Sequence, residues 1–343
     1  MPARRETQKY IEEELPYRIL SDVYENSRST LKEMGRKLDI SYQIVGRLLK
    51  RLEEQYRIVY TLDLDEQALG FSEGRVITIK FGKAPNVDLL KEKFRKDIFV
   101  QDAYLATGDF DLLIYVVGLT SKDFQAWQFS LRKEFSEYVP TVKVSNLNEK
   151  QIGFFPIRDE LIRESTVLND VEKRILITLN GDSRIKLKDL VRRSNTTQMR
   201  AIYAIQKLKE KGVIRRFSAL TQNPDKRLFA CYTLAITPIK EHNKLFLEFA
   251  KEVVAEGSRE IVNDYAFWSE CQGSIDALVL CSFANGEVMA KRGPNLIERL
   301  WSAESPKIEK AMLTGIIVGK WPFHLEGYEK FNELIKKLNP TKS

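Results

Sequence analysis

One stretch of this chain occurs twice. Residues 18–58 align without a gap onto residues 174–214, and eleven of the 41 aligned positions are identical. The identities include the Arg-Ile-Leu triplets that begin at Arg18 and Arg174, and the Ser-Arg pairs that begin at Ser27 and Ser183. A repeat of this length is one supersecondary unit. The chain is therefore an internal duplication, and its fold has to be understood one copy at a time.

Each copy has a helical pattern that two polar segments interrupt. In the first copy, apolar residues at spacings of three and four predict three short helices, with Ser41 as the N-cap of the third. The second copy repeats this pattern, with a polar turn at 194–197. Two helices joined by a tight turn after a first helix are typical of a helix-turn-helix domain. The β-prone segments 57–62 and 212–217 predict a wing after each third helix. A three-helix bundle without a nucleic-acid role has the same periodicity.

Charge favours DNA over that alternative. Between Arg174 and Phe217, basic residues outnumber acidic ones by more than the net charge of +7 of the whole chain. Clustered Lys and Arg neutralise phosphates, and the first residues of a third helix in the major groove face base edges. The predicted DNA contacts lie on the second and third helices and the wings. They are Ser41, Tyr42, Gln43, Arg47, Lys50 and Arg51 in copy one, and Lys188, Arg192, Arg193, Thr197, Gln198, Arg200, Tyr203, Lys207, Arg215 and Arg216 in copy two. Because the two sets differ, either the modules read different sequences or one of them alone reads sequence.

A segment with alternating strand and helix signals follows each helix-turn-helix. The order is β-α-β-β-α-β, which is typical of a ferredoxin-like domain with one antiparallel sheet. In copy one the predicted elements are 75–81, 87–94, 99–106, 111–117, 121–135 and 141–145. In copy two they are 229–236, 244–254, 262–270, 275–283, 286–301 and 308–318. The expected fold class is α+β, with two winged helix-turn-helix domains and two ferredoxin-like βαββαβ domains in tandem. The expected boundaries are 1–16 for an extension, 17–65, 70–155, 166–220 and 226–322 for the domains, and 323–343 for a helical tail.

Three short motifs in this order resemble a known family. They are Asp39-Ile-Ser41 at the start of a third helix, Gly212-Val-Ile214 after one, and the hairpin Thr107-Gly-Asp-Phe-Asp111. Together they resemble the Lrp/AsnC group of prokaryotic transcription regulators, whose second domain is the amino-acid-binding RAM domain. The resemblance implies a sequence-specific regulator that binds double-stranded DNA, a small effector such as an amino acid, and a homodimer or higher homo-oligomer formed through the sheet domains.

The same resemblance implies an effector site at the hairpins of the sheet domains. The candidate residues are Thr107, Gly108, Asp109 and Asp111, with Gly273, Ser274 and Asp276 as their equivalents in copy two. Family members are usually single copies that dimerise, so the fused chain is expected to form an internal pseudo-dimer. It also departs from the family at Tyr56-Arg-Ile58 and at Ser274. The alternative is that these residues form β-turns, because Gly and Asp favour turns for backbone reasons alone.

An enzyme is the main alternative function. The chain is also similar to the siroheme decarboxylases, a branch with the same two-domain plan, whose chemistry is expected to need His and Arg in the sheet domain. The two histidines, His242 and His324, do not lie on predicted strands. We therefore expect no enzyme, and an interaction module without DNA binding is the third alternative.

Motifs for other chemistry and for targeting are absent. The chain has no phosphate-binding glycine loop, and its three cysteines form no Cys-x-x-Cys pair. No metal or cofactor is expected. No apolar run is long enough for a membrane span and no signal peptide is recognisable, so a cytoplasmic protein is expected.

Overall fold

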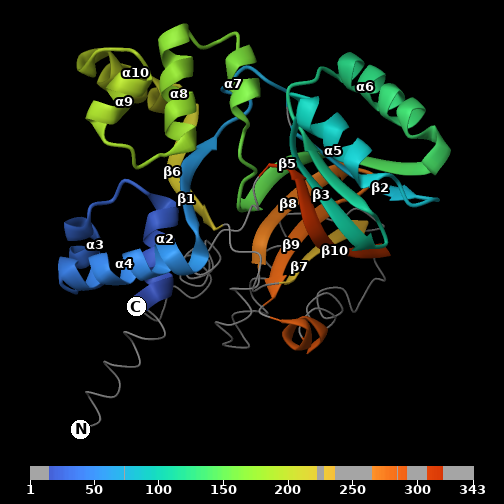
Figure 1. The fold of residues 1–343 in the computed structure, drawn as a ribbon, viewed down its shortest axis with the longest axis horizontal. Helices are drawn as coiled ribbons and strands as arrows, with labels where there is room; N and C mark the ends of the chain where they lie inside the picture. The colour runs from blue at the N-terminus through green and yellow to red at the C-terminus, as the bar shows by residue number, and fades with distance from the viewer. Residues whose placement is uncertain are drawn as a thin grey trace, which may run out of the picture.

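The computed structural model describes residues 15–72, 74–221, 228–235, 265–283, 285–291 and 307–319. These residues form a pair of helical modules and a β-barrel (Figure 1). None of the described helices is long and apolar enough to cross a membrane.

Module one consists of three helices and the strand that follows them. These elements are α2 (Leu15–Glu25), α3 (Leu31–Leu38), α4 (Tyr42–Tyr56) and β1 (Ile58–Leu64). A capping box between Thr30 and Glu33 starts α3, and the Ser41 side chain accepts a hydrogen bond from the Ile44 N–H at the start of α4. Asp39, in the left-handed region with φ 54°, makes the tight turn between them. The three helices predicted for this copy are confirmed.

Module two repeats this arrangement. Its elements are α8 (Asp170–Gly181), α9 (Leu187–Arg193), α10 (Gln198–Glu210) and β6 (Ile214–Thr221), and the short helix α7 (Asp159–Glu164) precedes them. The Thr197 side chain caps α10 by accepting from the Arg200 N–H. The helix-turn-helix prediction is therefore confirmed in both copies.

The two modules are joined by their last strands. β1 and β6, which were expected as wings, form a two-stranded antiparallel sheet in which Thr61 lies opposite Ser218. The first helix of each module packs against the strand of the other, α2 on β6 and α8 on β1. The modules are thus intertwined, because each one uses a strand of the other copy to complete its core.

The repeated Ser-Arg pairs lie where the modules meet. The Oγ atoms of Ser27 and Ser183 are 2.6 Å apart, and both side chains are fully buried. Arg28 donates from Nε to the Ser183 carbonyl oxygen at 2.7 Å, and its guanidinium lies 4.6 Å from the centre of the Phe217 ring. In the same way, the guanidinium of Arg184 lies over the ring of Tyr60 from copy one. The identity of these residues in both copies is explained by a shared contact between the copies.

The sheet domains together close a barrel. The strands are β2 (Arg75–Phe81), β3 (Val100–Gly108), β4 (Leu112–Val116) and β5 (Pro140–Ile152) from copy one, and β7 (Leu228–Ala235), β8 (Tyr265–Gly273), β9 (Ala277–Phe283) and β10 (Lys307–Val318) from copy two. Their order is β10-β3-β4-β2-β5-β8-β9-β7, closed by β7 on β10. Two seams, β5 with β8 and β10 with β3, join the copies.

Two helices cover the outside of the first sheet. α5 (Val87–Lys96) and α6 (Ser121–Glu134) pack on it through a core that includes Leu90, Phe94 and Phe124. The order β2-α5-β3-β4-α6-β5 is the predicted ferredoxin-like order. In copy two all four strands are described. Its predicted helix at 244–254 lies outside the described residues, and the one at 286–301 is described over 286–291, where Asn285 accepts from the Val288 N–H.

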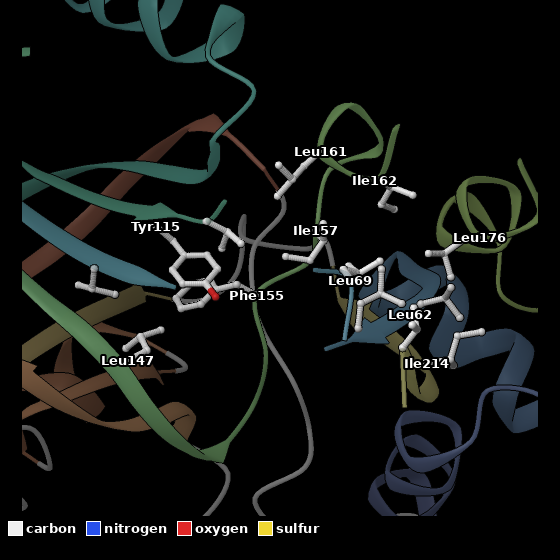
Figure 2. Packing of buried hydrophobic residues seen from close by; sticks show 14 of the residues in the cluster. Leu62, Leu69, Tyr115, Leu147, Phe155, Ile157, Leu161, Ile162, Leu176 and Ile214 are labelled. Atoms are coloured by element: carbon white, nitrogen blue, oxygen red, sulfur yellow. The ribbon is translucent and has the colours of Figure 1, made fainter. Parts of the chain in front are cut away.

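One hydrophobic core runs from the barrel into module two. Figure 2 shows it passing from Tyr115 and Leu147 through Phe155 and Ile157 to Leu176. Tyr115 and Phe155 stack with ring centres 4.5 Å apart. Module one instead has a core of its own, built on α2, α3 and α4 and joined by Ala219 from β6. Module two and the barrel therefore share one apolar interior, to which β1 adds Leu62 and Leu64, whereas the core of helices α2, α3 and α4 is separate.

This difference predicts unequal effects of one mutation made in both copies. Leu20 and Leu176 are equivalent and buried, so Leu20→Ala and Leu176→Ala should each remove about 2–5 kcal/mol of local packing. Leu176→Ala should also reduce the hydrogen-exchange protection of β3 and β4, because its core continues into the barrel. Leu20→Ala should leave those strands unchanged. Equal effects of both changes on the barrel would contradict the separation of the cores.

Candidate nucleic-acid interface and effector hairpins

Helices α4 and α10 each bury one side and expose the other. In α10, Ala201, Ala204 and Leu208 are buried, while Gln198 and Tyr203 are exposed. The same spacing in α4 buries Val45, Leu49 and Leu52. In Figure 1, α10 lies on the side of α8 away from the barrel, and α4 runs across module one from α3 toward β1.

Most of the residues predicted to contact DNA are solvent-exposed. The exposed ones are Ser41, Tyr42, Gln43, Arg47, Lys50, Arg51, Lys188, Arg192, Arg193, Thr197, Gln198, Arg200 and Tyr203. Arg192 makes a surface ion pair with Asp189, with 2.9 Å between its Nη2 and the carboxylate. Such exposed pairs contribute little and break readily. These side chains remain predicted DNA contacts.

Three other predicted contacts are held by carboxylates of the chain itself. Arg215 donates twice to Asp65 across the β1–β6 sheet, at 2.6 and 3.0 Å. Arg216 donates from Nε to Asp63 at 2.9 Å. The Nζ of Lys207 lies 3.5 Å from the nearly buried carboxylate of Glu172 on α8. The two strand arginines therefore connect the modules, and any contact they made with DNA would compete with these pairs.

Arg200 lies on the flank of α10. It lines a shallow groove between α8 and α10 together with Tyr203 and Lys207, and the same groove is lined by Asp170 and Glu172 of α8. Its guanidinium thus emerges beside the first turn of α8, whereas the outward face of α10 is formed by other residues.

The predicted effector hairpins lie on the two seams of the barrel. The Asp109 N–H donates to the Lys310 carbonyl at 2.9 Å, and the Asp109 carboxylate accepts from the Lys310 N–H at 2.8 Å. At the other seam, the Ser274 N–H donates to the Val144 carbonyl at 3.0 Å and the Ser274 hydroxyl accepts from the Val144 N–H at 3.3 Å. Serine therefore performs the same task as aspartate, which explains the departure at this position.

The remaining hairpin residues also have structural roles. Asp111 accepts from Lys80 and from the Phe81 N–H, each at 2.8 Å, and Thr107 pairs with Met312 across the seam. The carbonyl of Asp276 accepts from the Cys271 N–H at 2.7 Å. Each of these residues closes a turn or a seam, and effector binding at them stays a prediction.

Both hairpin glycines are required by backbone geometry. Gly108 has φ +145° and Gly273 has φ +143°, and a Cβ at these positions would lie 2.4 Å from the Lys310 carbonyl and 2.6 Å from the Val144 carbonyl. Neither approach is compatible with a side chain.

Alanine at the hairpins should therefore open the seams. We expect Gly108→Ala and Gly273→Ala each to lower the free energy of unfolding by more than about 1 kcal/mol, measured in urea. Gly181→Ala is the matched control, since it has no neighbour within 4 Å and lies in a helix. The control should be neutral or slightly stabilising. A hairpin variant as stable as the control would show that the seams tolerate a shift.

The ion pair between Asp65 and Arg215 makes stability depend on pH. Burial acts to raise the pKa of Asp65, but hydrogen bonds from the Ala68 N–H and from Arg215 outweigh it and hold the pKa below its usual value. A carboxylate with a lowered pKa stabilises the fold above its unfolded pKa of about 3.9, and this contribution is lost as the pH falls through the folded pKa.

Asp65→Asn tests this contribution. At pH 7 it should lower the free energy of unfolding by about 1 kcal/mol, and the difference from the unmodified chain should shrink as the pH falls below the unfolded pKa of about 3.9 and through the lower folded pKa. Asp88→Asn is the control, because Asp88 forms an exposed ion pair with Lys91. Because it breaks no contact between the modules, it should cost less stability at pH 7 than Asp65→Asn. A constant Asp65→Asn deficit down to acidic pH would assign the loss to packing rather than charge.

Two tyrosines place hydroxyls next to carboxylates in the interior, and no sequence pattern predicted them. Tyr115 donates to Glu66 at 2.7 Å and Tyr104 donates to Asp102 at 3.1 Å. Burial, followed by the neighbouring carboxylate, raises the pKa of each tyrosine well above its usual value. Both hydroxyls are therefore neutral donors at physiological pH.

The free cysteines Cys231, Cys271 and Cys281 are buried. Within the described ranges, no group of three or more His, Cys, Asp or Glu side chains could hold a metal ion.

Comparison with known proteins identifies the second module. Residues 168–215 match a family model described as winged helix-turn-helix DNA-binding. The chain is 24% identical, over 131 residues, to an uncharacterized HTH-type transcriptional regulator of Pyrococcus furiosus. That alignment covers 38% of this chain and 80% of the relative.

Solved structures share the overall fold of this chain. The siroheme decarboxylase NirDL aligns over 95% of this chain and 99% of its own, at 15% identity and a TM-score of 0.56. A second structure of NirDL, with an iron-uroporphyrin III analogue, aligns over 94% and 98% at 16% identity and a TM-score of 0.55. An AsnC family transcriptional regulator from Agrobacterium tumefaciens, 19% identical, covers 46% of this chain with 98% of its own length, at a TM-score of 0.35. The chain thus shares its tandem helix-turn-helix and ferredoxin-like fold with NirDL, and its second module matches a winged helix-turn-helix DNA-binding family.

Proposed function

We propose that this chain is a transcription regulator that binds double-stranded DNA sequence-specifically through both helix-turn-helix modules. The observation that carries the proposal is the intertwined pair of modules, each with an exposed, N-capped third helix. Module two adds the match to a DNA-binding family and a row of exposed cations on α9 at Lys188, Arg192 and Arg193.

The β1–β6 sheet sets the distance between the two third helices. Because both strands belong to one two-stranded sheet, the modules would engage half-sites separated by about one helical turn of DNA or a multiple of it. Cations on α9 would neutralise phosphates, and residues at the start of α10 would face the bases.

A small effector such as an amino acid would act through the barrel seams. Thr107, Gly108 and Asp109 are exposed at one seam, and Gly273 and Ser274 are exposed at the other. A ligand that preferred one arrangement of the seams would shift the population of barrel states, and hence the relative placement of the modules. Association of several chains through their sheet domains into a homodimer or larger assembly belongs to the same proposal.

A fluorescence-anisotropy titration tests DNA binding. The purified chain is titrated against DNA from upstream of its own gene and against a scrambled duplex, at low and near-physiological salt. We expect preference for the upstream duplex and a steep salt dependence.

Arg193→Ala should weaken binding to all duplexes alike and make the salt slope shallower by about 0.9, because one phosphate contact is lost.

Lys96→Ala is the control for that variant. It removes the same charge from an exposed position on α5, which lies on the barrel. Binding by this variant should match that of the unmodified chain. Failure to bind any duplex at low salt would reject the regulator.

The second candidate function is siroheme decarboxylation, favoured by the alignment of NirDL over nearly the whole chain. Buried side chains of both sheets form one cluster between them, among them Tyr104, Leu113 and Tyr115 of copy one and Leu278 and Leu280 of copy two. The two histidines of the chain, His242 and His324, lie outside the described residues. Incubation with siroheme under anaerobic conditions, followed by mass spectrometry, should leave the tetrapyrrole unchanged. Loss of carbon dioxide from it would establish the enzyme.

A further inference from the structure

Helix α10 exposes three large apolar side chains on its outward face. Met199 is 78% exposed, Tyr203 is 67% exposed and Ile202 is 45% exposed. Ile202 and Tyr203 follow Met199 by three and four residues, so both lie beside it on one helical face, opposite the buried Ala201, Ala204 and Leu208. We refer to Met199, Ile202 and Tyr203 as the apolar stripe. Contiguous exposed apolar groups are typical of binding surfaces when they are large, and this one lies on the face of the third helix that a helix-turn-helix presents to its ligand.

The same face of α4 has a different chemistry. The offset of 156 residues places Gln43 and Arg47 at the positions of Met199 and Tyr203, and Gly46 at the position of Ile202. Gln43 and Arg47 are exposed, so the face is outward in both copies. Copy one therefore presents an amide and a cation where copy two presents the apolar stripe.

The surroundings of the apolar stripe favour DNA as its occupant. Lys188, Arg192 and Arg193 on α9 are exposed, and Arg200 emerges on the flank of α10. An apolar protein partner would have to desolvate these cations or supply carboxylates for them. The major groove of DNA instead offers phosphates around its edges and, at its floor, the C5-methyl group of thymine as the apolar feature of a base.

We propose that the apolar stripe reads thymine methyl groups in the major groove, so that module two selects A·T-containing half-sites. This inference rests on the proposed DNA-binding function and adds its base specificity. Gln198 and Gln206 are exposed beside the stripe, and glutamine is the side chain that pairs in a bidentate way with adenine, the partner of thymine. The α4 face, with Arg47 and Lys50, is suited to guanine or phosphate instead.

Replacing thymine by uracil tests the proposal, because it removes the methyl group and leaves base pairing intact. A preferred duplex is first selected from a random pool with the full chain. Each thymine is then replaced in turn, and the dissociation constant is measured by anisotropy. We expect about fourfold weaker binding at one to three positions, the loss that corresponds to one buried methyl group.

Met199→Gln gives α10 the residue of copy one and should remove the uracil effect at one or more of those positions. Since Met199 is 78% exposed, the change should not alter folding, which circular dichroism and the unfolding temperature would verify. Val87→Gln is the control: it makes a comparable change at an exposed apolar residue of α5 and should retain the full uracil effect.

Other outcomes separate this inference from the proposed function. A flat uracil scan with a chain that still prefers its selected duplex would overturn the role of the apolar stripe and leave the regulator standing. If no thymine position responds to uracil and Met199→Gln also lowers the molar mass measured by light scattering, the apolar stripe is a protein-docking face and the base-reading role is overturned. Failure to select any preferred duplex would overturn the regulator itself.

Discussion

The antiparallel pairing of β1 with β6 is the interaction on which the arrangement of this chain depends. Each strand would otherwise present unpaired backbone groups, and each module would lack the surface that its first helix covers. Since α2 packs on β6 and α8 packs on β1, neither module is complete by itself. The buried contact between Ser27 and Ser183 lies beside this sheet, where the Ser27 N–H donates to the Phe217 carbonyl of β6 and the Ser183 N–H to the Tyr60 carbonyl of β1.

The barrel applies the same principle to the sheet domains. A four-stranded sheet has two edges, and both edges of each sheet are covered here by the other copy. The two hairpins complete the seams because Asp109 and Ser274 each bond the backbone of a strand from the other copy. The residues predicted as an effector site in each copy are therefore the residues that join the two copies.

Much of the fold could be predicted from the sequence, because it depends on local patterns that occur twice. The periodicity of 18–56 and 174–210, the caps Ser41 and Thr197, and the order of elements around α5 and α6 are local features. Strand partners could not be predicted, since the pattern of a strand does not identify the edge it will bind. For that reason the sequence predicted the strands as wings but not their pairing with each other, and it did not predict the ion pairs of Arg215 and Arg216. The apolar stripe could have been found by comparing the two third helices position by position. The tyrosine–carboxylate contacts at Glu66 and Asp102 carry no such signal.

The covalent connection between the copies has a consequence for mass action. In a dimer of separate chains, the fraction of paired modules falls as the protein is diluted, and DNA affinity falls with it. Here β1 and β6 belong to one chain, so their encounter is intramolecular and its effective concentration is set by the connecting segments. Even at a few copies per cell, the two modules of each chain would therefore stay paired. Covalent linkage also ends the requirement that both halves be alike, so each third helix is free to acquire its own side chains.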